Sequence, residues 1–371
     1  MKKTLSILMV LVLVLSVFTG CSKKSEAPAA TAAPEVKAEV KAEKPAPKAP
    51  ALKVGMVTDS GTIDDRSFNQ GTYEGVKNAA DELGLECTYL RPNGTTTAEY
   101  VTAIADLYDS GYRFVACPGF LFDEAVTQAS QMFPDLNLVI LDSAPEAGNN
   151  VVSVVFKEHE SGFVAGVAVA LQLKEGKVGF VGGIEIPPVQ KFNWGFQQGI
   201  AYANANYGTN IVIKPENFVY SGSFSDVALG QQLATTMYSS GVDCIFACAG
   251  GVGVGVINEC KNRVLAGEDV WVLGVDVDQY AQGDLGNGKS CIITSAMKYI
   301  DRAAGNLVKA AANGTFPGGT LQVLGAAENG VGIPADNPNL DDAVEAEVAK
   351  VYAKVASGEI VVQDNPEGLI K

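Results

Sequence analysis

The chain has 371 residues, of which 47% are hydrophobic and 19% are charged, so it has enough apolar material for packed cores and is long enough for two domains. Its 42 acidic residues outnumber the 27 basic ones, and the net charge of −15 argues against a partner that is a nucleic acid polymer, which clustered cations bind. The single histidine, His159, excludes metal sites built from several histidines and leaves one candidate for histidine-dependent catalysis.

The amino terminus has the layout of a targeting segment. Two lysines precede an apolar run over residues 7–17, which is shorter than the roughly 20 residues that a membrane-spanning helix needs. The run is followed by Thr-Gly-Cys ending at Cys21, which resembles the lipobox of bacterial lipoproteins. We therefore predict a lipoprotein signal peptide over residues 1–20 and lipidation of Cys21, with an ordinary secretory peptide as the alternative.

Residues 21–52 consist largely of Ala, Pro, Lys and Glu and contain no aromatic residue, which predicts a disordered, extended tether. Residues 1–52 hold eight of the 27 basic and four of the 42 acidic residues, which leaves residues 53–371 with a net charge of −19. An anionic bilayer is expected to repel this acidic part.

From residue 52 onward the chain alternates between strand and helix patterns. The first unit is a strand over 52–58, a helix over 68–83 that ends at Gly84, and a strand over 86–90. Further helices are predicted over 97–109, 123–132, 158–173, 189–207, 226–239, 252–264 and 301–313, and further strands over 114–117, 138–141, 178–181, 211–213, 244–247, 271–275 and 291–294. This alternation predicts an α/β protein with two doubly wound, parallel-sheet lobes.

The late segments are too short for a third domain, so we expect them to cross between the lobes and form a multi-strand hinge. The predicted N-terminal lobe covers residues 53–157 plus about 290–320. The predicted C-terminal lobe covers residues 158–289 plus about 321–371.

Acidic residues, glycines and aromatic residues follow the predicted strands. Asp59, Asp142 and Asp276 each come at or directly after a strand, and a Gly-Gly pair at 250–251 follows another. Ligands of open parallel sheets bind at the carboxyl ends of the strands, so these groups predict a cleft for a small, neutral, polar ligand. The alternatives are that the aspartates cap helices and that Phe68 is an ordinary core residue.

Other motifs are absent or carry no chemistry. Residues 250–255 read GGVGVG, which does not match G-x-G-x-x-G, and the sequence contains neither a P-loop nor a G-x-S-x-G elbow. His159 is interpreted as a surface or helix-start residue. The six cysteines after Cys21 are scattered in apolar runs and are interpreted as core thiols, with metal ligands as the alternative and pairing left open. No catalytic residue, metal or cofactor is predicted.

Five motifs in order resemble the basic membrane protein family of lipoproteins, of the purine nucleoside receptor type. They are VTDSGTIDDRSFNQ (57–70), GGIEIPPVQKF (182–192), AGGVG (249–253), GVDVDQ (274–279) and TSAMK (294–298). The resemblance covers residues 53–313. It implies a type I periplasmic-binding-protein fold and a monomer that captures a nucleoside such as inosine, guanosine or adenosine and is not an enzyme. It further implies delivery to the permease and ATPase subunits of an ABC importer, with the lipid anchor holding the protein on the membrane, facing the periplasm or the cell exterior.

The resemblance also implies the ligand-binding residues. Matching the motifs position by position gives Asp59, Phe68, Asn69, Asp142, Phe246, Gly250, Gly251, Asp276 and Lys298. Phe68 is expected to stack on the base, a contact worth about 1 to 3 kcal/mol per base in single-strand binders. Asp142 is expected to accept hydrogen bonds from the base, while Asp276 and Lys298 hold the ribose hydroxyls.

Three other functions remain open at this point. A sugar or autoinducer receptor of the same fold would share the acidic cleft. A nucleoside hydrolase would need a metal or an activated water. A structural or adhesive lipoprotein would bind no small molecule. We also expect the ligand to close the two lobes about the hinge.

Overall fold

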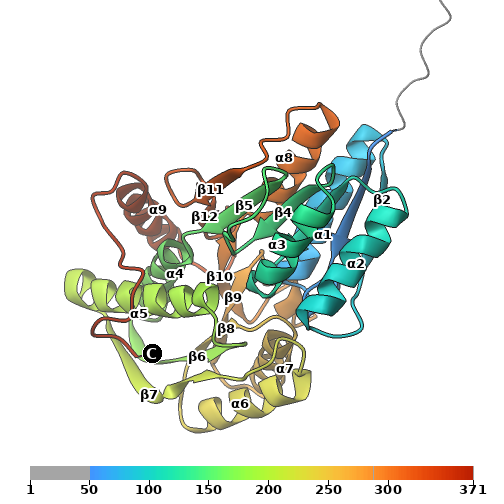
Figure 1. Cartoon of the computed structure of the whole chain (residues 1–371). Coiled ribbons are helices and arrows are strands. Elements are labelled where there is room, and N and C mark those ends of the chain that lie inside the picture. The colour runs from blue at the N-terminus through green and yellow to red at the C-terminus, as the bar shows by residue number, and fades with distance from the viewer. Residues whose placement is uncertain (1–50, 287, 371) are drawn as a thin grey trace, which may run out of the picture. The chain divides into compact units, whose positions relative to one another are not determined.

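The computed structural model describes residues 51–286 and 288–370. The predicted signal peptide, the lipidation site Cys21 and nearly all of the predicted tether lie outside the described residues. Within the described part the chain forms two six-stranded sheets. Figure 1 shows helices packed on both faces of these sheets. The predicted α/β architecture with two parallel-dominated sheets is confirmed.

The first sheet has the strand order β11-β5-β4-β3-β1-β2, and all its neighbours are parallel. Its strands are β1 (Lys53–Val57), β2 (Glu86–Leu90), β3 (Phe114–Pro118), β4 (Asn137–Leu141), β5 (Val151–Phe156) and β11 (Thr320–Leu324). On one face α1 (Phe68–Leu83) packs against α8 (Ile300–Ala312), and on the other α2 (Thr97–Asp109) packs against α3 (Asp123–Met132), with the short η1 (Phe120–Phe122) beside them. The alternation of β3 divides the faces, because Phe114 and Ala116 join one core cluster whereas Val115 and Cys117 join the other.

The second sheet has the order β12-β10-β9-β8-β6-β7 and is parallel except for the β10–β12 pair. Its strands are β6 (Glu175–Gly182), β7 (Asn210–Tyr220), β8 (Cys244–Cys248), β9 (Trp271–Asp276), β10 (Ile292–Lys298) and β12 (Val331–Gly332). One face carries α4 (Glu158–Leu173) and α5 (Pro187–Tyr207), with α9 (Asp342–Ala356) against α4. The other face carries α6 (Val227–Ser239) and α7 (Gly251–Leu265), and η2 (Tyr280–Gly283) follows β9.

The chain passes between the sheets at three places in its described part. It leaves the first sheet after β5, returns from β10 to α8, and leaves again between β11 and β12. The predicted boundaries put residues 290–320 in the N-terminal lobe and 321–371 in the C-terminal lobe, whereas β10 pairs with β9 of the second sheet and β11 pairs with β5 of the first. Lys298, the last residue of β10, therefore lies directly at a crossing.

The predicted helices and strands are all present. Their ends match the predicted ones or shift by one to four residues, except that β7 extends seven residues further, to Tyr220. Three strands and one α-helix were not predicted. These are β5, β11, β12 and α9. Strand β5 follows β4 without a helix between them, so it interrupts the strand–helix alternation on which the prediction relied. Helix α9 carries a detectable signal, because Val344, Val348, Val351 and Val355 recur at helical spacing and are buried.

Helices α4 and α5 approach each other closely through glycines. A Cβ atom at Gly162, Gly166, Gly195 or Gly199 would lie closer than 3.0 Å to a backbone oxygen of the partner helix. Glycines four residues apart share one helix face, so the two pairs form a smooth strip along each helix. This contact fixes the position of the first turn of α4 against α5.

We predict that Gly199→Ala destabilises the protein by at least about 1 kcal/mol, because the added methyl group meets the Phe163 carbonyl oxygen and the overpacking exceeds the gain in helix propensity. Denaturant unfolding measures the change. The control Asn206→Ala, at an exposed position of α5, should change stability by no more than about 0.5 kcal/mol. Equal effects of the two substitutions would contradict the close packing.

Candidate functional site

A cavity lies where the carboxyl ends of both sheets meet. It encloses about 570 Å³ of space, including the part open to solvent. Residues that follow β1, β3 and β4 line it from the first sheet, and residues at the ends of β8, β9 and β10 line it from the second. The cavity thus occupies the position that ligands take in open parallel sheets.

Seven of the nine residues predicted to bind ligand line this cavity. They are Asp59, Phe68, Asn69, Asp142, Gly250, Asp276 and Lys298. Segments up to about 240 residues apart in sequence are brought together here, and both lobes contribute charged side chains.

Phe246 and Gly251 are not among the lining residues. The Phe246 side chain is fully buried, and its ring contacts Phe192 at 5.9 Å between centroids, edge to face. Phe192 does line the cavity, so Phe246 supports that wall from behind. Gly251 begins α7, and its backbone N–H donates a hydrogen bond of 2.8 Å to the carbonyl oxygen of Phe224. Phe224 lines the cavity, so this bond helps to hold the cavity wall.

The ammonium group of Lys298 is the charge centre of the site. Its Nζ lies 2.6 Å from Asp142 Oδ2, at the end of the first sheet, and 3.4 Å from Asp276 Oδ1, on the strand next to its own. The Lys298 side chain is 3% exposed and those of Asp142 and Asp276 are 6% and 10% exposed. The ion pair with Asp142 therefore links the two lobes in a place shielded from water, where removal of one partner is costly.

The pKa values of this pair reflect burial and mutual attraction. Burial alone would lower the pKa of Lys298, but Asp142, Asp276 and Glu158 outweigh it, so the pKa is raised and the lysine stays charged. Burial raises the pKa of Asp142 from its usual range, and the charge of Lys298 opposes that rise. Asp142 Oδ1 is buried and has no hydrogen-bond partner among the described residues. It is an unused acceptor on a residue that lines the cavity.

The backbone at the two aspartates is unusual. Asp142 has φ of 61° and Asp276 has φ of 65°, in the left-handed region, which costs roughly 1 kcal/mol or more for a residue with a Cβ atom. Both lie where a strand ends. Ser67, at the start of α1, donates from its hydroxyl to Asp276 Oδ2 at 2.5 Å, which adds a second link between the lobes.

Asp59, Asp65 and Asn69 form a hydrogen-bonded group at the start of α1. The Asn69 side chain donates to Asp59 Oδ1 and Asp65 Oδ2, both at 2.8 Å, and accepts from the Asp59 backbone at 3.1 Å. Asp65 also accepts from the backbone N–H groups of Ser67, Asn69 and Gln70 at 2.9, 3.0 and 3.1 Å, so it caps α1. Burial raises the pKa of Asp59 to about 6, although bonds from Gly61 and Asn69 oppose the shift. The side-chain nitrogen and oxygen of Asn69 are thus both hydrogen-bonded within the protein, so this residue holds Asp59 and Asp65 in place.

The Asp59 carboxylate accepts hydrogen bonds from Gly61 N at 2.7 Å and from Asn69 Nδ2 at 2.8 Å, both through Oδ1. A Cβ atom built on Gly119 would lie 3.2 Å from Asp59 Oδ2 and 3.6 Å from the Phe68 ring. Gly119 and Phe68 both line the cavity, so Oδ2, which lies near them, is the oxygen of the Asp59 carboxylate on the cavity side.

Aromatic rings make up much of the remaining wall. Phe68 is half-buried, and Lys298 Nζ lies 4.4 Å from its ring centroid, a cation–π contact that helps to orient the ring. Phe120, Phe192 and Phe224 also line the cavity. Flat apolar faces beside carboxylates suit a ligand that has both an aromatic ring and polar hydrogens.

Glu158 is a buried acid next to this charge centre that sequence reasoning missed. It is the first residue of α4, is 2% exposed, and its Oε2 has no hydrogen-bond partner among the described residues. Burial and the charge of Asp142 raise its pKa to about 8, opposed by Lys298. The neighbouring His159 lies in the first turn of α4 as expected, but it is buried rather than exposed, and burial lowers its pKa to about 4.

Several other lining residues were also missed. Phe120 follows β3, and Pro188, Val189 and Phe192 stand in the motif 182–192, so the sequence marks these positions although no ligand contact was assigned to them. Phe224 lies in the loop before α6 and gives no such signal.

Within residues 51–286 and 288–370, no group of three or more His, Cys, Asp or Glu side chains is arranged to hold a metal ion. The six described cysteines are free thiols, and all but the half-buried Cys87 are buried, which agrees with the interpretation as core residues. Across the same residues, none of the helices combines the length and the apolar character required to traverse a bilayer.

Comparison with known proteins defines the class. A solute-binding protein of an ABC transporter system from Aeropyrum pernix K1 matches this structure with a TM-score of 0.74 and 25% identity, over 85% of this chain and 95% of that one. The fold is that of the type I periplasmic solute-binding proteins, as the family resemblance implied.

The family follows from the sequence. The family model described as "ABC transporter substrate-binding protein PnrA-like" (Bmp) matches residues 52–366. The "CD4+ T-cell-stimulating antigen" of Listeria monocytogenes is 33% identical over 84% of this chain and 88% of that one. The "ABC transporter nucleoside-binding protein BmpA" of Lactococcus lactis is 32% identical over 84% of this chain and 89% of that one. The chain belongs to the Bmp family of ABC transporter substrate-binding proteins, whose members bind substrate and are not enzymes.

We predict that Lys298→Met destabilises the protein by about 3 to 5 kcal/mol at neutral pH, because Asp142 and Asp276 lose their buried counter-charge. Denaturant unfolding measures the loss. The control Lys309→Met removes an exposed ion pair with Glu82 and should cost less than about 1 kcal/mol. If the two variants lose similar, small amounts of stability, Lys298 is not the charge centre.

We predict that the unliganded protein loses stability as the pH rises from about 6.5 to 8, by on the order of 1 to 2 kcal/mol. In this range Glu158, with a folded pKa of about 8, holds a proton that the unfolded chain has already released, so folding takes up protons. His159 has an ordinary pKa of 6.5 and a lowered folded value, so it contributes little there. Unfolding at both pH values should show a smaller decline for Glu158→Gln, and equal declines would contradict this role.

Proposed function

We propose that the protein captures a neutral purine nucleoside in the cavity between its lobes and delivers it to an ABC importer. The observation that carries the proposal is the combination of an aromatic wall with carboxylates from both sheets around one cavity. The nucleoside-binding relative from Lactococcus lactis supports the same ligand class. Inosine, guanosine and adenosine all fit this chemistry.

Each part of the site has a role in this proposal. The base lies against the ring face of Phe68 opposite Lys298, while Phe192 and Phe120 complete the apolar walls. The unpartnered Asp142 Oδ1 accepts a hydrogen bond from a base N–H group. Asp276 and Lys298 hold the ribose hydroxyls through charge-assisted hydrogen bonds.

The charge of the cavity supports a neutral ligand. Asp59, Asp65, Asp142 and Asp276 line it, whereas Lys298 is its only lining cation among the described residues. This excess of carboxylates disfavours the phosphate groups of nucleotides by repulsion. Selectivity for the nucleoside thus follows from repulsion as well as attraction.

The proposal includes the position of the protein in the cell. Lipidation of Cys21 anchors the chain to the membrane, and the tether over residues 21–52 extends the binding lobes toward the periplasm or the cell exterior. There the protein, as a monomer, meets the permease, and the ATPase subunits drive import. In the cavity, Gly250 directly precedes α7 and has no side chain, so the ligand can approach the backbone there.

We predict that Phe68→Ala weakens inosine binding at least tenfold, a loss of about 1.4 kcal/mol or more within the range of about 1 to 3 kcal/mol that a base–aromatic contact contributes. Isothermal titration calorimetry of the purified protein measures the affinity. The matched control is Phe133→Ala, which removes another half-buried phenylalanine of the same lobe that stacks on Tyr108 away from the cavity.

The control variant should keep the wild-type affinity even if it is less stable. Unchanged affinity of Phe68→Ala would contradict the stacking role. Tight binding of free ribose that excludes inosine would instead support a sugar receptor, and inosine turnover would support a hydrolase.

A further inference from the structure

The two lobes also meet outside the cavity, where the start of α1 lies against the segment that follows β9. The Arg66 carbonyl oxygen of the first lobe accepts hydrogen bonds from Gln279 Nε2 at 2.9 Å and Gln282 Nε2 at 2.8 Å of the second lobe. A carbonyl oxygen has two lone pairs, so the two amides use both of them. The segments approach closely here, since a Cβ atom built on Gly71 would lie 2.8 Å from Val277 Cγ1.

The backbone of Arg66 is held in an unusual conformation. Its φ is 54°, in the left-handed region that residues with a Cβ atom rarely adopt. Its N–H donates to the Gln70 side chain at 3.1 Å, and its own side chain is exposed to solvent. The contribution of Arg66 to the contact with the second lobe is therefore its carbonyl group, whose direction the local backbone fixes.

Gln279 is held in place by the second sheet. It is 2% exposed, its Oε1 accepts from the backbone of Val275 at 2.9 Å, and its own N–H donates to Ser295 Oγ at 3.1 Å. A Cβ atom at Gly274 would lie 2.7 Å from Gln279 Oε1, so the missing side chain in β9 makes room for the glutamine. The side-chain nitrogen is thus left to reach the first lobe.

Gln282 lies in η2 and is half-buried. Its Oε1 is buried and has no hydrogen-bond partner among the described residues, whereas its Nε2 donates to Arg66. An unpaired buried acceptor is unfavourable. The position of this amide therefore satisfies the bond between the lobes in preference to its own oxygen.

This contact stands next to both walls of the cavity. Ser67 and Phe68, which directly follow Arg66, line the cavity from the first lobe, and Asp276 lines it from the second. Two-lobed binding proteins admit and release ligands by a hinge motion. Separation of the lobes at this point breaks both bonds to the Arg66 carbonyl.

We propose that Gln279 and Gln282 form an inter-lobe latch on the Arg66 carbonyl, which slows the release of the bound nucleoside without contacting it. The proposal rests on the proposed function, because it assigns the two glutamines a role in retaining that ligand. None of the three residues lines the cavity, so the glutamines are positioning residues that keep the two walls together. One hydrogen bond changes an equilibrium constant roughly two- to tenfold, so loss of one bond should speed release by a similar factor.

Surface plasmon resonance on the immobilised protein measures the association and dissociation rates of inosine. We expect Gln282→Ala to release inosine roughly two- to tenfold faster than the wild type, with an association rate that is not reduced. Gln282→Glu has the same size but places a carboxylate without a donor against the Arg66 carbonyl. It should accelerate release at least as much, which separates the hydrogen bond from packing.

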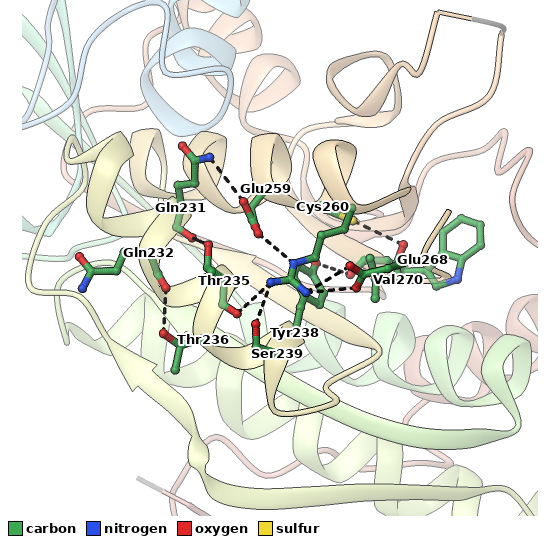
Figure 2. Close-up of polar contacts among 12 residues, drawn as sticks. Gln231, Gln232, Thr235, Thr236, Tyr238, Ser239, Glu259, Cys260, Glu268 and Val270 are labelled. Atoms are coloured by element: carbon green, nitrogen blue, oxygen red, sulfur yellow. Dashed lines mark hydrogen bonds and ion pairs between the residues drawn. The ribbon is translucent and has the colours of Figure 1, made fainter. Parts of the chain in front are cut away.

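The matched control is Gln231→Ala. Gln231 is another half-buried glutamine of the second lobe, and Figure 2 shows its amide donating to Glu259, at 3.4 Å, between α6 and α7. This bond does not join the lobes, so the control should keep the wild-type rates. The proposal is overturned if either Gln282 variant releases inosine at the wild-type rate, if its association rate falls, or if Gln231→Ala accelerates release equally.

A second measurement separates failure of the latch from failure of the proposed function. If the wild type binds no nucleoside, the proposed function is wrong, and small-angle X-ray scattering of the unliganded proteins then tests the latch. The latch joins protein groups alone, so we expect a larger radius of gyration for Gln282→Glu than for the wild type and for Gln231→Ala. Identical scattering curves for the three proteins would overturn the latch.

Discussion

The buried ammonium group of Lys298 is the interaction on which the site depends. It lies at the end of β10, where the chain leaves one sheet for the other, and it pairs with Asp142 from the first sheet and Asp276 from the second. Three carboxylates, including Glu158, surround this single cation, so at least one carries a raised pKa. The ion pair between Lys298 and Asp142 therefore links the lobes, and it leaves Asp142 Oδ1 without a hydrogen-bond partner among the described residues.

The fold explains why these groups meet. Parallel sheets place the ends of β1, β3 and β4 at one edge and the ends of β8, β9 and β10 at another, and the three crossings bring the two edges together. The left-handed backbone at Asp142 and Asp276 is a local cost that a binding site maintains through its surroundings. The close α4–α5 packing positions Glu158 near the Lys298 charge centre and Phe192 in the wall of the cavity.

Much of the fold was predictable because it follows from local patterns. Apolar runs and helical spacing predict the strands and helices, and the strand-end rule predicts Asp59, Asp142 and Asp276 as neighbours. The crossings between the sheets decide which sheet β10 and β11 join, and no local pattern encodes them. The predicted lobe boundaries therefore differ from the observed sheets. Glu158 and Phe224 reach the site area through tertiary placement, and Phe246, although in a matching strand, points into the core.

The central claim is that a nucleoside lies between the lobes with its base on Phe68 and its polar edges on the Lys298 charge centre. A crystal structure of the protein soaked with inosine tests this most directly. The account predicts density for inosine in this cavity, with the base against the Phe68 ring and polar groups within hydrogen-bond distance of Asp142 and Asp276. An empty cavity at saturating inosine, or inosine bound elsewhere, would contradict it.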